Sequence, residues 1–417
     1  MKRFSYLLSI FVFGFLINLS LQNDSEAWVC AINADGDIIL SDAGVAGTAF
    51  KDEVAFGTTN QPAPFNYTSG VVDDDGFNSN LSDQCSAEPL FYKMKVYKIA
   101  MCTKDPYGGD NGGTSTSINP NFEDCINILN SPEGKIVEIE KGVDGNDLLD
   151  GSDLVIPTGE YPYLAIVLSN HLHVKHVQGY VNDEDGAVNM YGLGSLDGSG
   201  NIVTAKVGKY CYSTAVVSTI SGLWAGDATY QNAHLDLEGN AVTVVDTEPG
   251  TGTSRMICVS DKATALTEAA YATEIIDHFG DLETDDHTAI PDNFIPYADV
   301  SEYYKGAGVT DVSLAGTSMA ANMLNADGVT TAQSFVNAQR IGMYLKYTQN
   351  IPKITENTVG IKLNIGTTMG ISIDSAQNIN GGTAVVQSWM VKVGVDPFTA
   401  VIQVQDRDPR GVRGAFR

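Results

Sequence analysis

The stretch "FYKMKVYKIAMC" at residues 91–102 alternates polar and apolar side chains and is rich in tyrosine, valine and isoleucine. Successive side chains of a β-strand point to opposite faces of a sheet, and aromatic and β-branched residues favour strands. The stretch therefore predicts a strand. "KIVEIEKG" at 135–142 alternates in the same way, because its glutamates share one face and Val137 and Ile139 share the other.

Strand patterns of this kind recur along most of the chain, and turn residues separate them. Asp-Gly pairs are frequent in these turns and suit tight hairpins, because glycine tolerates a positive φ. The expected strands are 91–102, 135–142, 159–181 (a strand pair or one bent strand), 209–220, 240–247, 340–349, 358–366, 369–375, 384–395 and 398–406. Together they predict a mainly β fold, an antiparallel β-sandwich of Ig-like or jelly-roll-like type.

One segment departs from this pattern, and we expect a partly helical insertion at 259–335. "TALTEAAYATEIIDHF" (264–279) has apolar residues near helical spacing, with Ser260 or Asp261 as a cap and Gly280 as the end. "TSMAANML" (317–324) also fits a short helix, capped by its threonine or serine.

The N-terminus has the layout of a cleavable export signal over residues 1–27. Lys2 and Arg3 precede an apolar run at 6–21, then a polar stretch and the small residue Ala27. The alternative is an anchoring helix, but the run is short for a bilayer span, which needs about 20 residues. We expect a secreted, extracellular or cell-surface protein, with the periplasm as the alternative, and no integral membrane segment after cleavage.

About 390 residues remain after residue 27, more than one hydrophobic core usually supports. The expected regions are an N-terminal β and loop region (28–90), the first part of the sandwich (91–258), the insertion (259–335), the second part of the sandwich (336–406) and a basic tail (407–417).

The net charge of −27 makes this an acidic protein, and removing residues 1–27 leaves the charge unchanged because two basic and two acidic residues are lost. Such a surface repels nucleic acid, so no nucleic-acid partner is expected. All six cysteines follow the signal, and an even number in an exported chain indicates disulfides. We expect neighbours in sequence to pair, as Cys102–Cys125 and Cys211–Cys258, which leaves Cys30 with Cys85.

The stretch at 316–321, around Ser318, resembles the segment that carries the nucleophilic serine of subtilisin-like proteases. That chemistry needs a histidine base and a carboxylate that orients it. No histidine here is followed by glycine, no Asp-Ser-Gly or Asp-Thr-Gly is present, and Asn322 stands where the family has proline. We therefore interpret Ser318 as a lookalike and predict no catalytic residue.

Two kinds of metal site are suggested by the sequence. In "NHLHVKH" (170–176), His171 and His173 share one face of a strand and could begin a zinc or copper site, whereas the alternative is an exposed polar face. The pairs Asp73/Asp75 and Asp183/Asp185 match the middle of a calcium loop but lack its first ligand and its distal glutamate. No complete EF-hand is present. Calcium gathered from separate loops remains the candidate cofactor, with solvated hairpin turns as the alternative.

Three stretches carry a family resemblance: "YKMKVYKIAMCTKDP" (92–106), "IPTGEYPYLAIVLSN" (156–170) and "KVGVDPFTAVIQV" (392–404). They are similar to exported β-sandwich proteins of unknown role from marine bacteria and some of their phages. The resemblance implies the architecture and a surface or particle component, and it carries no functional residues across.

We therefore expect a non-catalytic structural or adhesive protein of a cell surface, filament or virus-like particle. Its partners would be other protein subunits, including copies of itself, or cell-surface components. One alternative is a secreted serine hydrolase that uses Ser318. Another is an outer-membrane β-barrel, favoured by the near-terminal Phe416 but opposed by the arginine-rich last ten residues.

Overall fold

The computed structural model describes residues 32–40, 83–107, 119–141, 156–182, 189–192, 206–219, 236–244, 256–277, 294–299, 316–333, 337–367, 369–375, 388–395 and 399–407. The strands are β1 (Ile38–Leu40), β2 (Asp83–Ala87), β3 (Phe91–Cys102), β4 (Cys125–Glu140), β5 (Gly159–Glu160), β6 (Tyr163–Ser169), β7 (His171–Lys175), β8 (Val177–Asn182), β9 (Asn189–Gly192), β10 (Val207–Gly208), β11 (Tyr210–Ser213), β12 (Val217–Thr219), β13 (Met256–Val259), β14 (Ala272–Ile275), β15 (Phe294–Asp299), β16 (Thr317–Leu324), β17 (Arg340–Tyr347), β18 (Lys353–Ile354), β19 (Thr358–Gly366), β20 (Met369–Ser375), β21 (Ser388–Val395) and β22 (Thr399–Asp406). A short helix, α4 (Lys262–Glu268), accompanies them. The mainly β fold is confirmed.

Strand β3 organises the largest sheet, which has nine strands in the order β12-β14-β7-β3-β6-β17-β16-β15 with β4 also pairing with β3. Strand β4 follows β3 along its whole length, and β6 and β7 both pair with β3. A strand has only two edges, so β6 and β7 share the edge of β3 that β4 leaves open. The predicted bent strand at 159–181 is thus confirmed in part, since β6 and β7 continue one another and β8 leaves for another sheet.

The sheet forks at Asn170, the residue between β6 and β7. Ser169 pairs with Arg340 at the start of β17, whereas His171 pairs with Ile275 at the end of β14. The Asn170 side chain is 1% exposed, and its Nδ2 donates hydrogen bonds to the carbonyl oxygens of Ile276 (2.9 Å) and Ala338 (2.8 Å). This amide therefore joins the two branches.

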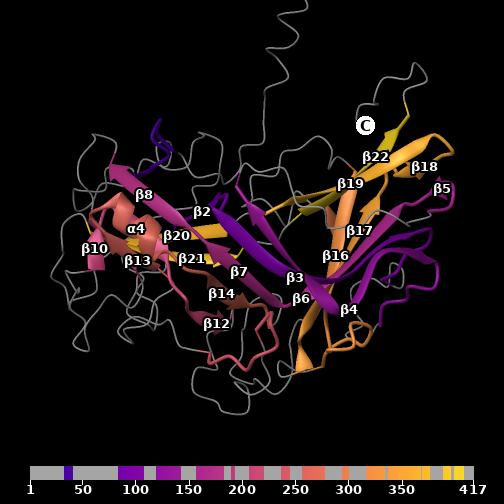
Figure 1. Cartoon of the computed structure of the whole chain (residues 1–417), viewed down its shortest axis with the longest axis horizontal. Coiled ribbons are helices and arrows are strands. Elements are labelled where there is room, and N and C mark those ends of the chain that lie inside the picture. Colours follow the sequence, from indigo (N-terminus) through magenta and orange to yellow (C-terminus); the bar gives the residue numbers. More distant parts are fainter. Residues whose placement is uncertain are drawn as a thin grey trace, which may run out of the picture.

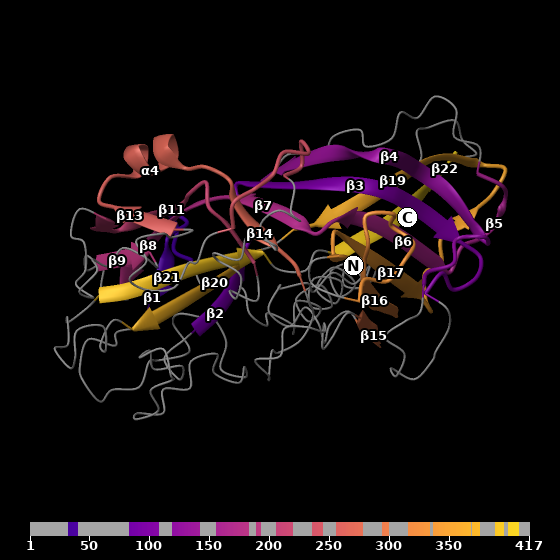
Figure 2. The same ribbon diagram turned by 90° about the horizontal axis from the view of Figure 1, so that it is seen from below.

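Two further sheets complete a sandwich at the other end of the molecule. One has the order β1-β8-β11-β13 and the other β10-β9-β21-β20-β2. Figure 1 shows these strands gathered at one end and β16, β17, β19 and β22 at the other, and Figure 2 shows β7 and β14 between the two groups. A single cluster of buried apolar side chains runs through both ends, from Met94 and Ile402 to Tyr180 and Val391. Two-stranded sheets, β18-β5 and β19-β22, complete the arrangement.

The expected helix over 264–279 is wrong in extent. Helix α4 is capped by Asp261, whose carboxylate accepts a hydrogen bond from the N–H of Thr264 at 2.7 Å, but the helix ends at Glu268, with Ala269 as its C-cap. Ala265 and the C-cap Ala269 pack on Tyr212 of β11, while Leu266 is 50% exposed. The chain then enters β14, where pairing with β7 and complete burial outweigh helix propensity.

The short helix expected for "TSMAANML" is also wrong, because these residues form β16. This strand lies between β15 and β17 and is buried on both faces. A strand buried on both faces reads as a continuous apolar run without alternation, which a short helix can mimic. The strand expected at 240–247 is not formed over its described residues, 240–244, where only Ala241 makes an isolated bridge.

Candidate functional site

Two disulfides each join residues that face one another on neighbouring strands. Cys102 of β3 is the register partner of Cys125 of β4, and Cys211 of β11 is the register partner of Cys258 of β13. Both predicted pairings are confirmed. Cys30, the expected partner of Cys85, lies outside the described residues.

Removing the second of these disulfides is expected to cost about 3 kcal/mol of unfolding free energy in the double variant Cys211→Ala/Cys258→Ala. The bridge closes a loop with a sequence separation of 47, which restricts the unfolded chain. Urea denaturation of the oxidised proteins measures the loss. A difference below about 0.5 kcal/mol would show that strand pairing alone holds β11 to β13.

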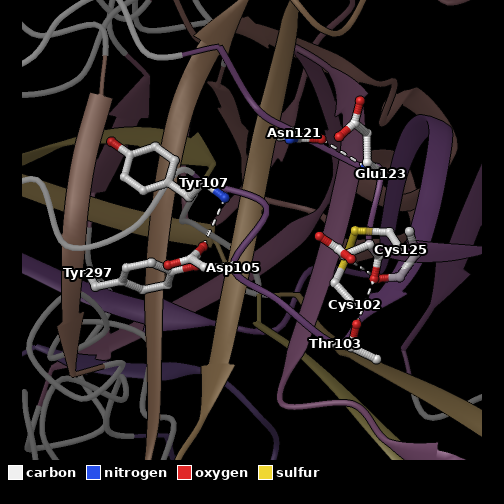
Figure 3. The surroundings of a disulfide bond; sticks show 10 residues. Cys102, Thr103, Asp105, Tyr107, Asn121, Glu123, Cys125 and Tyr297 are labelled. Atoms are coloured by element: carbon white, nitrogen blue, oxygen red, sulfur yellow. Dashed lines mark hydrogen bonds between the residues drawn. A yellow bond between two sulfur atoms is a disulfide. The ribbon is translucent and has the colours of Figure 1, made fainter.

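The first disulfide lies beside a cluster of tyrosines (Figure 3). The hydroxyl of Tyr297 on β15 donates to Asp105 Oδ1 at 2.9 Å, and the N–H of Tyr107 donates to the same oxygen at 2.9 Å. Tyr107 also packs edge-on against Tyr297 and beside Tyr344. Burial, followed by the nearby Asp105 carboxylate, raises the pKa of Tyr297, so its hydroxyl stays protonated. The cluster ties the turn after β3 to the far strands of the sheet.

Ser318 lies near the start of β16, where its register partners are Asp299 on β15 and Lys346 on β17. None of these three strands carries a histidine. The described histidines belong to β7 and the residue after it, whereas His234, His278 and His287 lie outside the described residues. The structure therefore brings no histidine base to Ser318 within the part of the chain that it describes.

We expect a fluorophosphonate probe to leave Ser318 unlabelled, because a serine hydroxyl without a base is a weak nucleophile. The measurement compares labelling of the wild-type chain with that of Ser318→Ala by intact mass. Stoichiometric labelling that disappears in Ser318→Ala would establish an activated serine and restore the hydrolase alternative.

The three histidines of "NHLHVKH" are buried, so the alternative of an exposed polar face is wrong. His171, His173 and His176 are only 2%, 9% and 3% exposed. The alternation in this stretch indicates a strand, but it does not show whether neighbouring strands bury that strand. In the structure β7 lies between β3 and β14. Within the described residues no group of three His, Cys, Asp or Glu side chains could hold a metal ion.

His173 belongs to a polar cluster that the sequence patterns did not predict. Its Nδ1 hydrogen-bonds with Thr273 Oγ1 at 2.8 Å, and burial, aided by Lys93, lowers its pKa to about 4. Beside it, the hydroxyl of Tyr271 donates to Glu138 Oε2 at 2.7 Å, and Lys93 lies 4.1 Å from the centroid of the Tyr271 ring. The cross-strand register of β3, β4, β7 and β14 assembles this cluster, so only knowledge of strand partners would have found it.

In the Thr273–His173 pair the hydroxyl could serve as a nucleophile and the neutral imidazole as its base, but Thr273 is only 5% exposed. A hydroxyl so enclosed cannot reach a substrate from solvent. The pair instead fixes β14 to β7. Likewise, the raised pKa of Tyr271, due mainly to burial and then to Glu138, keeps that phenol a hydrogen-bond donor.

The calcium candidates Asp73, Asp75, Asp183 and Asp185 lie outside the described residues. A different Asp-Gly turn, at Asp327, uses its carboxylate within the turn. Asp327 accepts hydrogen bonds from the N–H groups of Val329 and Thr330 and from the Thr330 hydroxyl. This carboxylate stabilises its own hairpin turn.

No known family model, curated protein or solved structure matches this chain. No helix in the described ranges is long and apolar enough to cross a membrane. The fold and its covalent links therefore define the class on their own: a disulfide-stabilised, mainly β protein.

Proposed function

We propose that this chain is a secreted, non-catalytic structural or adhesive protein of a cell surface or particle. The observation that carries the proposal is the pair of cross-strand disulfides, one in the nine-stranded sheet and one in the four-stranded sheet. Disulfides form and persist in oxidising compartments. They agree with the export signal predicted at residues 1–27, which lies outside the described residues.

The use of the polar groups supports a mechanical role. Asn170 joins two branches of a sheet, Thr273 and His173 join β14 to β7, and Asp105 joins two tyrosines. Each hydrogen-bonds another part of the fold. A protein whose buried polar residues connect its strands is suited to bearing load or presenting loops. Other subunits, including copies of itself, or cell-surface components are the partners we infer.

The proposal is tested by purifying the exported chain and measuring both assembly and adhesion. Light scattering and electron microscopy report oligomers or filaments, and glycan arrays and cell-binding assays report adhesion. We expect at least one of the two, weakened when the disulfides are reduced. A chain that stays monomeric and binds no cell, glycan or protein would contradict the proposal. Repeating the assays in EDTA tests the contribution of calcium.

A further inference from the structure

The N-terminal described segment, residues 32–40, forms a loop that is shaped by its own residues. Asn33 Oδ1 accepts hydrogen bonds from the N–H groups of Asp35 and Asp37, both at 2.9 Å. The N–H of Asn33 in turn donates to the Asp37 carbonyl at 2.9 Å. Gly36 takes φ +81°, a value that side chains rarely adopt. We call residues 32–40 the donor segment.

A specific site on the four-stranded sheet receives the donor segment. Lys209 Nζ lies 2.7 Å from Asp37 Oδ2, and the Asp37 side chain is only 4% exposed. Gln178 Nε2 donates to the Gly36 carbonyl at 2.9 Å. A β-carbon at residue 179 would overlap the Asp37 carboxylate, so glycine is required there. We call Gln178, Gly179, Tyr180 and Lys209 the acceptor site.

The contact combines a charged anchor with a buried apolar one. Ile38 is fully buried and belongs to the main core. Strand β1 pairs in parallel with β8, with Ile38 opposite Tyr180 and Leu40 opposite Asn182. An Asp–Lys pair held in one geometry beside a buried isoleucine selects one sequence and one register. This is how an added strand is usually recognised, by backbone pairing with side-chain pockets.

The donor segment ends in β1, which lies at the edge of its sheet among the described strands and whose partners lie far along the chain. The hydrogen bond from Gln178 to Gly36 spans 142 positions. Among the strands that the structure describes, β1 has β8 as its one neighbour in the sheet order. The next described strand after β1 is β2, at Asp83. The 42 residues between Leu40 and Asp83 reach at most about 150 Å when extended. A folded protein of 417 residues is only about 55 Å across. The connection between β1 and β2 is therefore long enough to reach a neighbouring copy.

We propose that the donor segment is exchanged between copies, so that residues 32–40 of one subunit occupy the acceptor site of another. The partner is a second copy of this chain, and the inference rests on the proposed structural role. Exchange keeps every donor contact and changes only the chain that supplies it, which makes it a low-cost route to association. Reciprocal exchange gives a dimer, and one-way exchange gives a linear chain of subunits. Crowding on a surface favours exchange, because a high local concentration of copies lets the donor segment of one subunit compete for the acceptor site of another.

The test mixes wild-type chains that carry ¹⁴N and ¹⁵N. The mixture is concentrated, opened briefly in mild urea, returned to buffer and examined by native mass spectrometry. A zero-length carbodiimide cross-linker then joins carboxylates to amines in contact. We expect oligomers of mixed mass, and cross-linked Asp37–Lys209 peptide pairs in which one peptide is light and the other heavy.

Variants identify the contact responsible. Lys209→Glu is expected to lower the mixed oligomers at least tenfold, whereas the matched control Lys206→Glu leaves them unchanged. A mixture of Asp37→Lys with Lys209→Asp restores opposite charges only between different chains, so mixed dimers are expected to return there. This mixture keeps the test decisive if either variant alone folds poorly.

Single-isotope monomers throughout, or mixed oligomers that persist in Lys209→Glu, would overturn the exchange. A monomeric wild-type chain that still binds cells or glycans would overturn the exchange and leave the proposed adhesive role standing. Mixed-isotope dimers that bind no cell or glycan would support the exchange and the structural role, and would count against the adhesive role.

Discussion

Replacing Asn170 with leucine is expected to lower the free energy of unfolding by about 4 kcal/mol. The change removes the two hydrogen bonds to the carbonyl oxygens of Ile276 and Ala338 and leaves both acceptors beside an apolar side chain. An unsatisfied buried polar group costs about 1–3 kcal/mol, and two are created at once. The leucine also has to fit a position that is 1% exposed. Urea unfolding measures the loss.

Two further variants separate the hydrogen bonds from side-chain volume. Asn170→Asp keeps the shape but directs a carboxylate at two carbonyl oxygens, so it should be at least as destabilising as the leucine. Asn130→Leu makes the same chemical change at an exposed residue of β4 and should stay within about 0.5 kcal/mol of wild type. An Asn170→Leu protein within about 1 kcal/mol of wild type would show that the fork does not depend on this amide.

The strands could be predicted because their side chains alternate locally. Strand β3 spans the residues whose alternation predicted it, and β19 and β20 also have the expected bounds. Their partners could not be predicted. Strand β2 pairs with β20, from the opposite end of the chain, and β21 pairs in parallel with β9. Alternation says that a segment is extended, whereas pairing depends on contacts between residues hundreds of positions apart.

The disulfides could be predicted because neighbouring cysteines sit on strands close enough to face one another. Asn170 could not, because a lone asparagine between two apolar runs reads as a turn. The burial of His173 and His176 was missed for a related reason. A histidine-rich strand is polar by composition, and only the strands on both sides of it show that solvent is excluded.

Acidification from pH 7.5 to pH 5 is expected to lower the free energy of unfolding by about 4 kcal/mol. Burial lowers the pKa of both His173 and His176 to about 4, whereas a histidine in the unfolded chain titrates near 6.5. Between these values the unfolded chain binds more protons, so stability falls as pH falls. Each histidine accounts for about 2 kcal/mol of the loss at pH 5. That is a large part of the 5–15 kcal/mol typical of a domain.

The surroundings of each ring explain why protonation is opposed. His173 faces Thr273 across the strands, with Lys93 disfavouring its positive charge and Asp236 partly offsetting that effect. His176 is enclosed where the chain passes from β7 to β8. There its ring Nε2 hydrogen-bonds with Gln178 Oε1 at 3.2 Å, and the backbone N–H of His176 donates to Ser213 Oγ at 2.9 Å. Lys141 also disfavours its charge, although the Gln178 contact favours it.

Glutamine variants assign the acid sensitivity to individual rings. His173→Gln and His176→Gln should each reduce the drop between pH 7.5 and pH 5 by about half, since glutamine keeps a polar side chain that does not titrate. Urea unfolding at both pH values supplies the four free energies that each comparison needs. Stability that is flat over this range, or a drop that neither variant reduces, would mean that the two rings become protonated in the folded state near pH 6. Water would then reach both imidazole rings, although β3, β14 and β11 surround them, on the time scale of titration.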